Sequence, residues 1–288
     1  MRGVDETAPG IRRVLCGNPG PLTGPGTNSY LLGDAHEVAV VDPGPEDAAH
    51  RAALVAAAGG ARIAAILVTH AHLDHSAGAP ALAGEVGAPV LAFGPATAGR
   101  DPALAGLPVG GGEGLDAAFV PDRALAAGEM LEVGGLHVEA LHTPGHFGGH
   151  LAFAVGPVCL SGDLVMGWST TLISPPDGDL ARFRESCARL SARGFARLLP
   201  GHGAPVEDPA ARVAELLAHR AARDAQIVDA LAAAPGTPAD IAARIYDVAP
   251  ALMPAAARNV LAHLLAARSE GRAVCDGPPG PEAVFRLL

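Results

Sequence analysis

Three histidines and an aspartate stand within six consecutive residues of this chain, at His70, His72, Asp74 and His75. Imidazole and carboxylate groups are the ligands that suit zinc, manganese and iron. A single histidine is more often a surface or core residue, but three of the chain's 12 histidines in so short a segment favour a metal site. Because three protein ligands with an open position are typical of catalytic zinc sites, the segment predicts chemistry rather than a structural role.

The elements that position these donors are indicated by the apolar runs. Residues 63–68 form a run that predicts a strand ending just before His70. Donors also follow three later runs, each beside a glycine: His142 and His146 after residues 136–141, Asp163 after residues 157–160, and His202 after residues 196–199. Glycine lets the backbone turn sharply and lie close to an ion. We therefore expect four strand ends to point donors at one place.

Taken in order, the motifs His-x-His-x-Asp-His, Thr-Pro-Gly-His, Gly-Asp and Pro-Gly-His-Gly resemble those of the metallo-β-lactamase superfamily. The resemblance implies an α/β fold, the αββα sandwich, around two divalent metal ions, Zn²⁺ first, with Mn²⁺ or iron as alternatives. It implies one metal held by His70, His72 and His146, a second held by Asp74, His75 and His202, and Asp163 bridging both.

The opening residues 18–21 and 26–32 are similar to one branch of that superfamily, which contains a mitochondrial β-lactamase-like endoribonuclease. Members of the branch carry a short winged-helix-like tail after the last histidine motif. One departure is Phe147, where relatives commonly have threonine, so a hydroxyl contact is lost and an apolar ring could narrow the pocket. His142 is expected to support the site rather than to bind metal, since seven donors are already assigned.

The chain is expected to divide near Val206. Residues 1–206 form the predicted metallo-β-lactamase-like catalytic domain, with short strands and helices such as 47–58. Residues 207–288 form the predicted winged-helix-like C-terminal domain. Its expected elements are a helix over 209–234, a second helix begun by Thr237 and Pro238, a third over 254–268, and strands over 272–275 and 283–287. This tail is expected to wall the active site or to form a homodimer contact.

Composition excludes several function classes. The chain has no lysine, which excludes Schiff-base catalysis, pyridoxal attachment and a phosphate-loop lysine. Its four cysteines form no Cys-x-x-Cys pair, which argues against a redox motif or a zinc ribbon. No run of 18 uncharged apolar residues and no apolar leader occur, so we expect a cytoplasmic enzyme with no membrane partner. The net charge of −10 argues against duplex DNA as a partner.

The candidate catalytic residue is Asp74, which is expected to orient a metal-bound hydroxide nucleophile and to shuttle its proton. Candidate pocket residues come from the loop near residue 28, from the segment after Asp163 and from one further histidine. They are Asn28, Ser29, Tyr30, His150, Trp168 and Thr170, with a structural role for His150 equally open.

Three functions remain open at this point. The first is hydrolysis of a small-molecule ester, thioester or lactone. The second is phosphodiester cleavage of single-stranded RNA, which needs arginines along a groove; the candidates are Arg100, Arg182, Arg184 and Arg258. The third is iron-dependent oxidation or a silent metal-binding regulator, which is disfavoured because a mononuclear iron enzyme needs fewer than seven donors.

Overall fold

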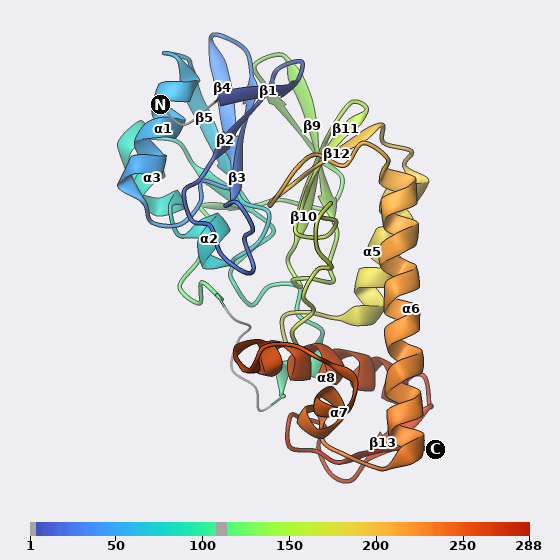
Figure 1. Ribbon diagram of the computed structural model, residues 1–288. Coiled ribbons are helices and arrows are strands. Elements are labelled where there is room, and N and C mark those ends of the chain that lie inside the picture. The colour runs from blue at the N-terminus through green and yellow to red at the C-terminus, as the bar shows by residue number, and fades with distance from the viewer. Residues whose placement is uncertain (1–3, 108–113) are drawn as a thin grey trace.

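Two β-sheets lie face to face between two layers of helices (Figure 1). The computed structural model describes residues 4–107 and 114–288. In spatial order, the larger sheet contains β1 (Val4–Ala8), β2 (Ile11–Leu15), β3 (Asn28–Gly33), β4 (Glu37–Val41), β5 (Arg62–Leu67), β6 (Val90–Ala92) and β7 (Arg123–Ala124). The smaller contains β12 (Arg197–Pro200), β11 (Val158–Gly162), β10 (Leu151–Val155), β9 (Leu136–His142) and β8 (Glu129–Val133). The predicted αββα sandwich is confirmed.

The central core fills the space between the two sheets. Leu67 from the first sheet and Phe153 from the second are fully buried there. Burying a side chain of that size contributes about 1.5–3 kcal/mol, so this layer helps to hold the two sheets together. Strands such as β10 are buried on both faces, which explains why they read as continuous apolar runs.

Helices cover the outer face of each sheet. On the first sheet lie α1 (Ala48–Ala58) and α3 (Ala79–Val86), and on the second lie α5 (Leu180–Ala192) and the first half of α6. Helix α1 begins where predicted, because the Asp47 carboxylate accepts hydrogen bonds from the N–H groups of Ala49 (2.8 Å) and His50 (3.2 Å). Gly59, at φ 65°, ends it in the left-handed region.

The strands that carry the predicted donors end on the same side of the sandwich. β11 and β12 run parallel, with Gly162 opposite Pro200, so their carboxyl ends are adjacent. The Leu151 N–H donates to the Thr69 carbonyl (2.8 Å) and joins the second sheet to the end of β5. The sandwich therefore gathers the four strand ends at one edge, as the sequence predicts.

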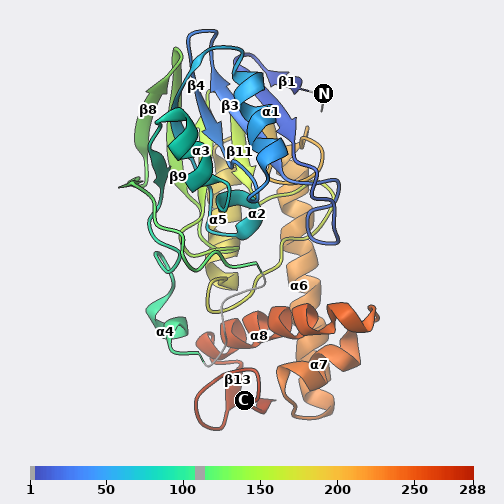
Figure 2. The ribbon, with the colours of Figure 1, turned by 90° about the vertical axis from the view of Figure 1, so that its left-hand side faces the viewer.

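The tail lies beyond that edge (Figure 2). It contains α6 (Pro209–Ala233), α7 (Pro238–Ile245), the 3₁₀ turn η1 (Pro250–Leu252), α8 (Met253–Ser269) and the antiparallel pair β13 (Ala273–Cys275) and β14 (Phe285–Leu287). Thr237 and Asp240 form a capping box that starts α7. The predicted winged-helix-like tail is confirmed.

Helix α6 belongs to both parts of the molecule. Val213 and Leu216 in its first half pack into the core of the second sheet, whereas Ile227 and Leu231 in its second half pack into the core of the tail. The predicted boundary at Val206 thus precedes a helix that both units share. Within residues 4–107 and 114–288, no helix combines the length and the apolar character needed to cross a membrane.

Candidate metal centre

The histidine-rich segment leaves β5 and turns at once into the one-turn helix α2 (Leu73–Ser76). This turn brings Asp74 and His75 to the edge of the sandwich directly after His70 and His72. Thr69 fixes its start, because its backbone N–H and its hydroxyl both donate to the Asp42 carboxylate, at 2.7 and 2.8 Å. The donors are thus held on a short segment anchored to two strand ends.

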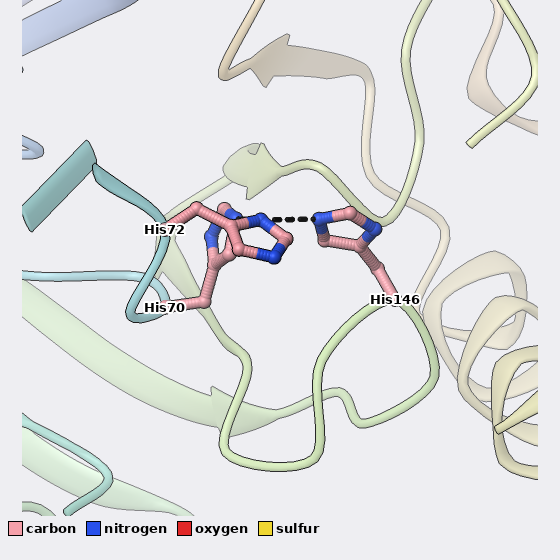
Figure 3. Close-up of side chains that lie close together, drawn as sticks. All are labelled: His70, His72 and His146. Atoms are coloured by element: carbon pink, nitrogen blue, oxygen red, sulfur yellow. Dashed lines mark hydrogen bonds between the residues drawn. The ribbon is translucent and has the colours of Figure 1, made fainter. Parts of the chain in front are cut away.

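The first donor cluster consists of His70, His72 and His146 (Figure 3). The Nδ1 atom of His72 lies 2.9 Å from Nε2 of His70 and 3.0 Å from Nε2 of His146. Three ring nitrogens from two segments far apart in sequence therefore face one another across a few ångströms. Such an arrangement suits a cation at their centre, provided that each nitrogen presents a lone pair.

The hydrogen bonds on the outer sides of these rings determine which nitrogen carries the proton. The Nδ1–H of His146 donates to the Leu172 carbonyl (2.7 Å), which can only accept. The Thr69 hydroxyl gives its proton to Asp42, so it must accept from Nδ1–H of His70 (2.9 Å). In both neutral rings Nε2 is then unprotonated and faces the cluster, which is the form that binds a metal.

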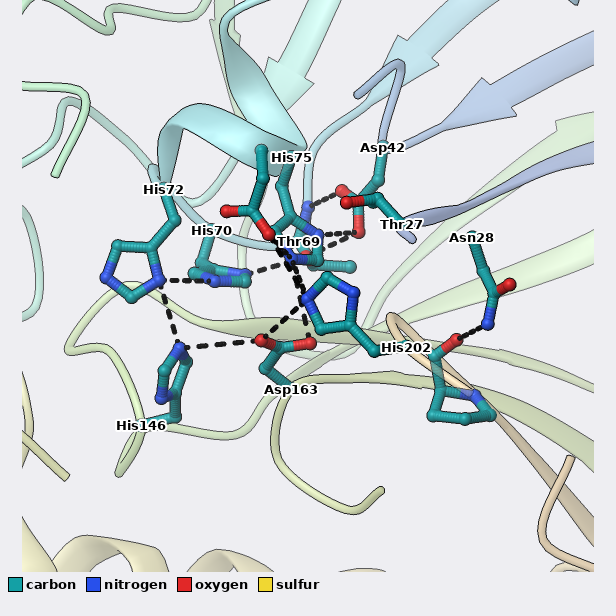
Figure 4. Close-up of polar contacts among 12 residues, drawn as sticks. Thr27, Asn28, Asp42, Thr69, His70, His72, His75, His146, Asp163 and His202 are labelled. Atoms are coloured by element: carbon teal, nitrogen blue, oxygen red, sulfur yellow. Dashed lines mark hydrogen bonds and ion pairs between the residues drawn. The ribbon is translucent and has the colours of Figure 1, made fainter. Parts of the chain in front are cut away.

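The second cluster consists of Asp74, His75 and His202 (Figure 4). Nε2 of His75 lies 3.2 Å from Nε2 of His202, and Oδ2 of Asp74 lies 3.2 Å from the latter atom. On the outer sides, Nδ1–H of His75 donates to Asp42 (2.9 Å) and that of His202 donates to the Gly26 carbonyl (3.3 Å). These contacts again turn the Nε2 atoms inward.

Asp163 lies between the two clusters (Figure 4). Its Oδ2 is 3.8 Å from Nε2 of His146 and 3.4 Å from Nε2 of His202, and its Oδ1 is 3.6 Å from Nε2 of His75. Oδ1 is buried and has no hydrogen-bond partner. A Cβ atom on Gly201 would lie 2.4 Å from that oxygen, so only glycine leaves room for it. A buried carboxylate with an orphaned oxygen, placed between two groups of inward-facing imidazoles, fits a site that would hold two divalent ions.

Burial and neighbouring charges give the two clusters opposite proton affinities in the metal-free protein. Burial, reinforced by neighbouring imidazoles, lowers the pKa of His70 well below its ordinary value and that of His72 to about 3. Burial also lowers the pKa of His146. These rings are therefore neutral at pH 7, ready to bind a cation.

The second cluster contains the carboxylates and behaves differently. Burial alone would lower the pKa of His202, but Asp163 and Asp74 outweigh it and raise the value to about 9. The same balance raises the pKa of His75 well above its ordinary value. Burial opposes ionisation of the two aspartates, yet these imidazoles hold the pKa of both carboxyls below its usual range. Protons and metal ions thus compete for this cluster.

A cavity opens over both clusters. Besides the donors His72, Asp74, His146, Asp163 and His202, its walls are Pro21, Leu22, Met166, Ser169, Thr170 and Leu172. Thr170 therefore lies where the sequence places it. Trp168 is instead partly exposed beside the cavity, with its indole packed against Gly24 and Gly203.

The structure corrects the expectation for the segment Asn28, Ser29 and Tyr30, which is the start of the buried strand β3. The Asn28 amide donates to the carbonyls of Pro200 and Gly203, both at 2.9 Å, and the Tyr30 hydroxyl donates to the Pro200 carbonyl at 2.8 Å. The Ser29 hydroxyl donates to the Asp42 carbonyl at 2.5 Å. These side chains hold the metal loops from beneath and do not line the cavity.

His150 and Phe147 are also buried beneath the donors. Nε2 of His150 accepts from the backbone N–H of Asp163 (3.1 Å), so this histidine positions Asp163. The Phe147 ring packs against His70 and His72, with centroids 5.8 and 5.2 Å away, and supports them rather than narrowing the pocket. His142 stacks on Phe93 and takes no part in the donor clusters found among the described residues.

Asp42 is the functional residue that the sequence reasoning missed. Its carboxylate accepts from Thr69 and from His75, and so sets the proton positions in both clusters. It is the first residue after β4 and precedes Pro43 and Gly44, with φ 50° in the left-handed region. The signal that identified the other donors, an acid at a strand end beside glycine, was present here as well.

Comparisons with known proteins agree with this geometry. The family described as Metallo-beta-lactamase superfamily matches residues 22–202, and the Beta-lactamase associated winged helix domain matches residues 237–278. The chain is 31% identical to an atrochrysone carboxyl ACP thioesterase of Aspergillus fumigatus, over 79% of this chain and 67% of that protein. It is 30% identical to the beta-lactamase-like protein 2 homolog of Drosophila melanogaster, over 93% and 91% of the two chains. A crystal structure of a metallo-beta-lactamase family protein from Thermus thermophilus superposes with a TM-score of 0.79 at 28% identity, covering 98% of this chain and 100% of that one.

Proposed function

The chain belongs to the metallo-β-lactamase superfamily and is a hydrolase of that superfamily. We propose that it uses two divalent ions to cleave a carboxylic ester-type bond, and that this bond is a thioester. The observation that carries this proposal is the position of the Asp163 carboxylate between the clusters: Oδ2 faces His146 and His202, and the unpartnered Oδ1 faces His75. Zn²⁺ is the proposed metal, because imidazole and carboxylate suit it; Mn²⁺ and iron are the alternatives.

A thioester is favoured by two independent observations. Relatives that span most of the chain are named as thioesterases acting on acyl carrier protein. Two of the four arginines expected to serve RNA are engaged in ion pairs: Arg100 pairs with Asp177 at 2.6 Å and Arg184 pairs with Asp224. Phosphodiester cleavage of single-stranded RNA therefore has less support than ester-type hydrolysis.

When bound, two divalent ions would make water acidic enough to ionise near neutral pH and would polarise the carbonyl under attack. Histidines of the two clusters would hold the ions, with the Asp163 carboxylate between them. Asp74 is the candidate that orients the attacking water and takes up its proton, since its side chain is 28% exposed on the cavity wall and its carboxyl stays ionised. Leu22, Met166 and Leu172 form an apolar rim that limits bulk water.

A cleavage assay tests the proposal. Zinc-loaded protein is incubated with a panel of acyl thioesters, esters and lactones, and in parallel with labelled single-stranded RNA. We expect thioester hydrolysis that Asp163→Asn abolishes and that Asp229→Asn, a change on the exposed side of α6, leaves intact. Cleavage of RNA without hydrolysis of any thioester, ester or lactone would overturn the proposal.

A further inference from the structure

A second cavity adjoins the metal cavity and extends toward the tail. The two cavities share Leu22, Thr170 and Leu172 as walls. The remaining walls come from Thr171, from α6, from residues 246–252 and from the first half of α8. We call this cavity the α6 groove. A substrate with its scissile bond over the metals can thus extend into the α6 groove without leaving the protein surface.

The floor of the α6 groove contains a buried arginine that forms no ion pair with any residue the structure describes. Arg220 is 1% exposed, and its hydrogen-bond partners are the Asn259 side-chain oxygen (2.8 Å) and the Thr171 carbonyl, both neutral. Its guanidinium also lies over the Phe183 ring, 5.4 Å from the centroid. Its Nε atom is buried without a hydrogen-bond partner. Burial lowers the pKa of Arg220 to about 10, which still leaves the side chain positive at neutral pH. A buried cation with neutral partners is costly unless an anion approaches it.

A second arginine lies one turn further along α6. The Arg223 guanidinium stacks on the Tyr246 ring at 4.0 Å and donates to the Gln226 side chain at 2.7 Å. Among the described residues neither Arg220 nor Arg223 forms an ion pair, although the neighbouring Asp224 pairs with Arg184. No acidic residue is found among the described residues that line the groove, in a protein whose net charge is −10. This local positive charge is therefore a feature of the groove and not of the surface as a whole.

The outer wall of the groove is apolar. Leu22, Val248 and Leu252 are 52%, 37% and 39% exposed, although each is large enough to be expected in a core. Exposed apolar side chains gathered around one cavity indicate a ligand site. The groove thus combines an apolar wall with cations at its base.

We propose that the α6 groove binds an anionic part of the substrate, with Arg223 and Arg220 as its anion-recognising residues and the apolar wall holding the chain that connects it to the scissile bond. The inference rests on the proposed thioesterase function and specifies its substrate. The anion is a carboxylate or a phosphate: a carboxylate at the far end of the acyl chain, or the phosphate of a phosphorylated thiol arm. Arginine suits both, because its planar fork matches either group.

The test uses three matched thioesters with the zinc-loaded enzyme. Hexanoyl-pantetheine is neutral, adipoyl-pantetheine adds a terminal carboxylate, and hexanoyl-4′-phosphopantetheine adds a phosphate on the thiol side. We expect one anionic substrate to have the higher kcat/KM, and Arg223→Gln to reduce that preference about tenfold through KM, the value of one charge-assisted hydrogen bond. Which anionic substrate is preferred identifies the source of the anion.

Two variants separate charge recognition from damage to the fold. Arg223→Lys keeps the charge and should restore part of the preference. Arg62→Gln removes a positive charge on the exposed edge of β5, where Arg62 pairs with Glu37, and should leave the preference unchanged. An equal preference in the wild type and in Arg223→Gln overturns the inference, as does a drop of equal size in Arg62→Gln.

Equilibrium binding keeps the inference testable if the enzyme hydrolyses no thioester. The non-cleavable thioether analogues of the same three compounds are titrated into the zinc-loaded protein and into Arg223→Gln. Tighter binding of an anionic analogue that Arg223→Gln weakens supports an anion site while the proposed reaction fails. Equal binding of all three analogues overturns the anion site. Displacement of the bound neutral analogue by a short RNA, but by neither anionic analogue, assigns the groove to nucleic acid instead.

Discussion

Replacing Asp42 by asparagine tests the proton positions deduced for both donor clusters. The Asp42 carboxylate accepts from the Thr69 hydroxyl at 2.8 Å and from Nδ1–H of His75 at 2.9 Å, both on Oδ2. Oδ1 accepts from the Thr69 backbone N–H at 2.7 Å, so the amide oxygen of asparagine would occupy that position. The amide NH₂ would then replace the atom that accepts from His75.

The expected loss follows from that reversal. A donor facing Nδ1 of His75 favours the ring form that carries its proton on Nε2, the atom turned toward Asp163 and His202. Changing a residue that orients a metal ligand typically costs about 10- to 100-fold in metal affinity. The same NH₂ group would face the Thr69 hydroxyl, which would then donate to Nδ1 of His70, so we expect Asp42→Asn to weaken both zinc-binding steps by about 10- to 100-fold.

The assay is a two-step Zn²⁺ titration against a chromogenic chelator. Thermal unfolding of the metal-free wild type and variant serves as the control for a folding defect. If the variant binds zinc in both steps with the affinities of the wild type, the deduction of proton positions from these hydrogen bonds is refuted.

Three further predictions follow from charge and packing. The pKa of His202 is raised to about 9, so below that pH a metal ion must displace a proton from this ring, and metal affinity should rise with pH up to about 9. A calorimetric enthalpy of zinc binding that is the same in buffers of different ionisation enthalpy would contradict this proton release. Gly201→Ala places a Cβ atom 2.4 Å from the Asp163 carboxylate and should lower zinc affinity by at least about tenfold in the same titration. Gly84→Ala, with open space around its Cβ, should not; equal effects would count against the proposed bridge. Phe285→Ala, in the core of the tail, should lower the free energy of unfolding by about 3–5 kcal/mol in a denaturant titration. Val284→Ala, at an exposed position, should change it by no more than about 0.5 kcal/mol, and similar losses in the two variants would contradict the packing described.

The sequence was most informative where a short motif follows a strand. His70 and Asp163 were placed correctly at the edge of the sandwich, because strand, turn and donor are local features of the chain. The tail was predictable for the same reason: Thr237 caps α7, and the apolar periodicity of α6 and α8 is long enough to identify a helix.

The pocket walls could not be predicted in the same way. Tyr30 and its neighbours belong to a motif that lies close to the donor clusters, but their side chains point into the layer beneath the donor loops. This orientation depends on how β3 packs against the second sheet. Leu22 and Leu172 become walls only because separate segments meet over the donors. The sharing of α6 between two cores likewise depends on the docking of the tail. These are long-range packing effects, and no local pattern encodes them.

The most direct test of the central claim is anomalous diffraction from crystals of the zinc-loaded protein. The account predicts two peaks, one among His70, His72 and His146 and one among Asp74, His75 and His202, with Asp163 in contact with both. A map from fully loaded crystals with no peak at these residues, or with Asp163 turned away from the histidines, would contradict it.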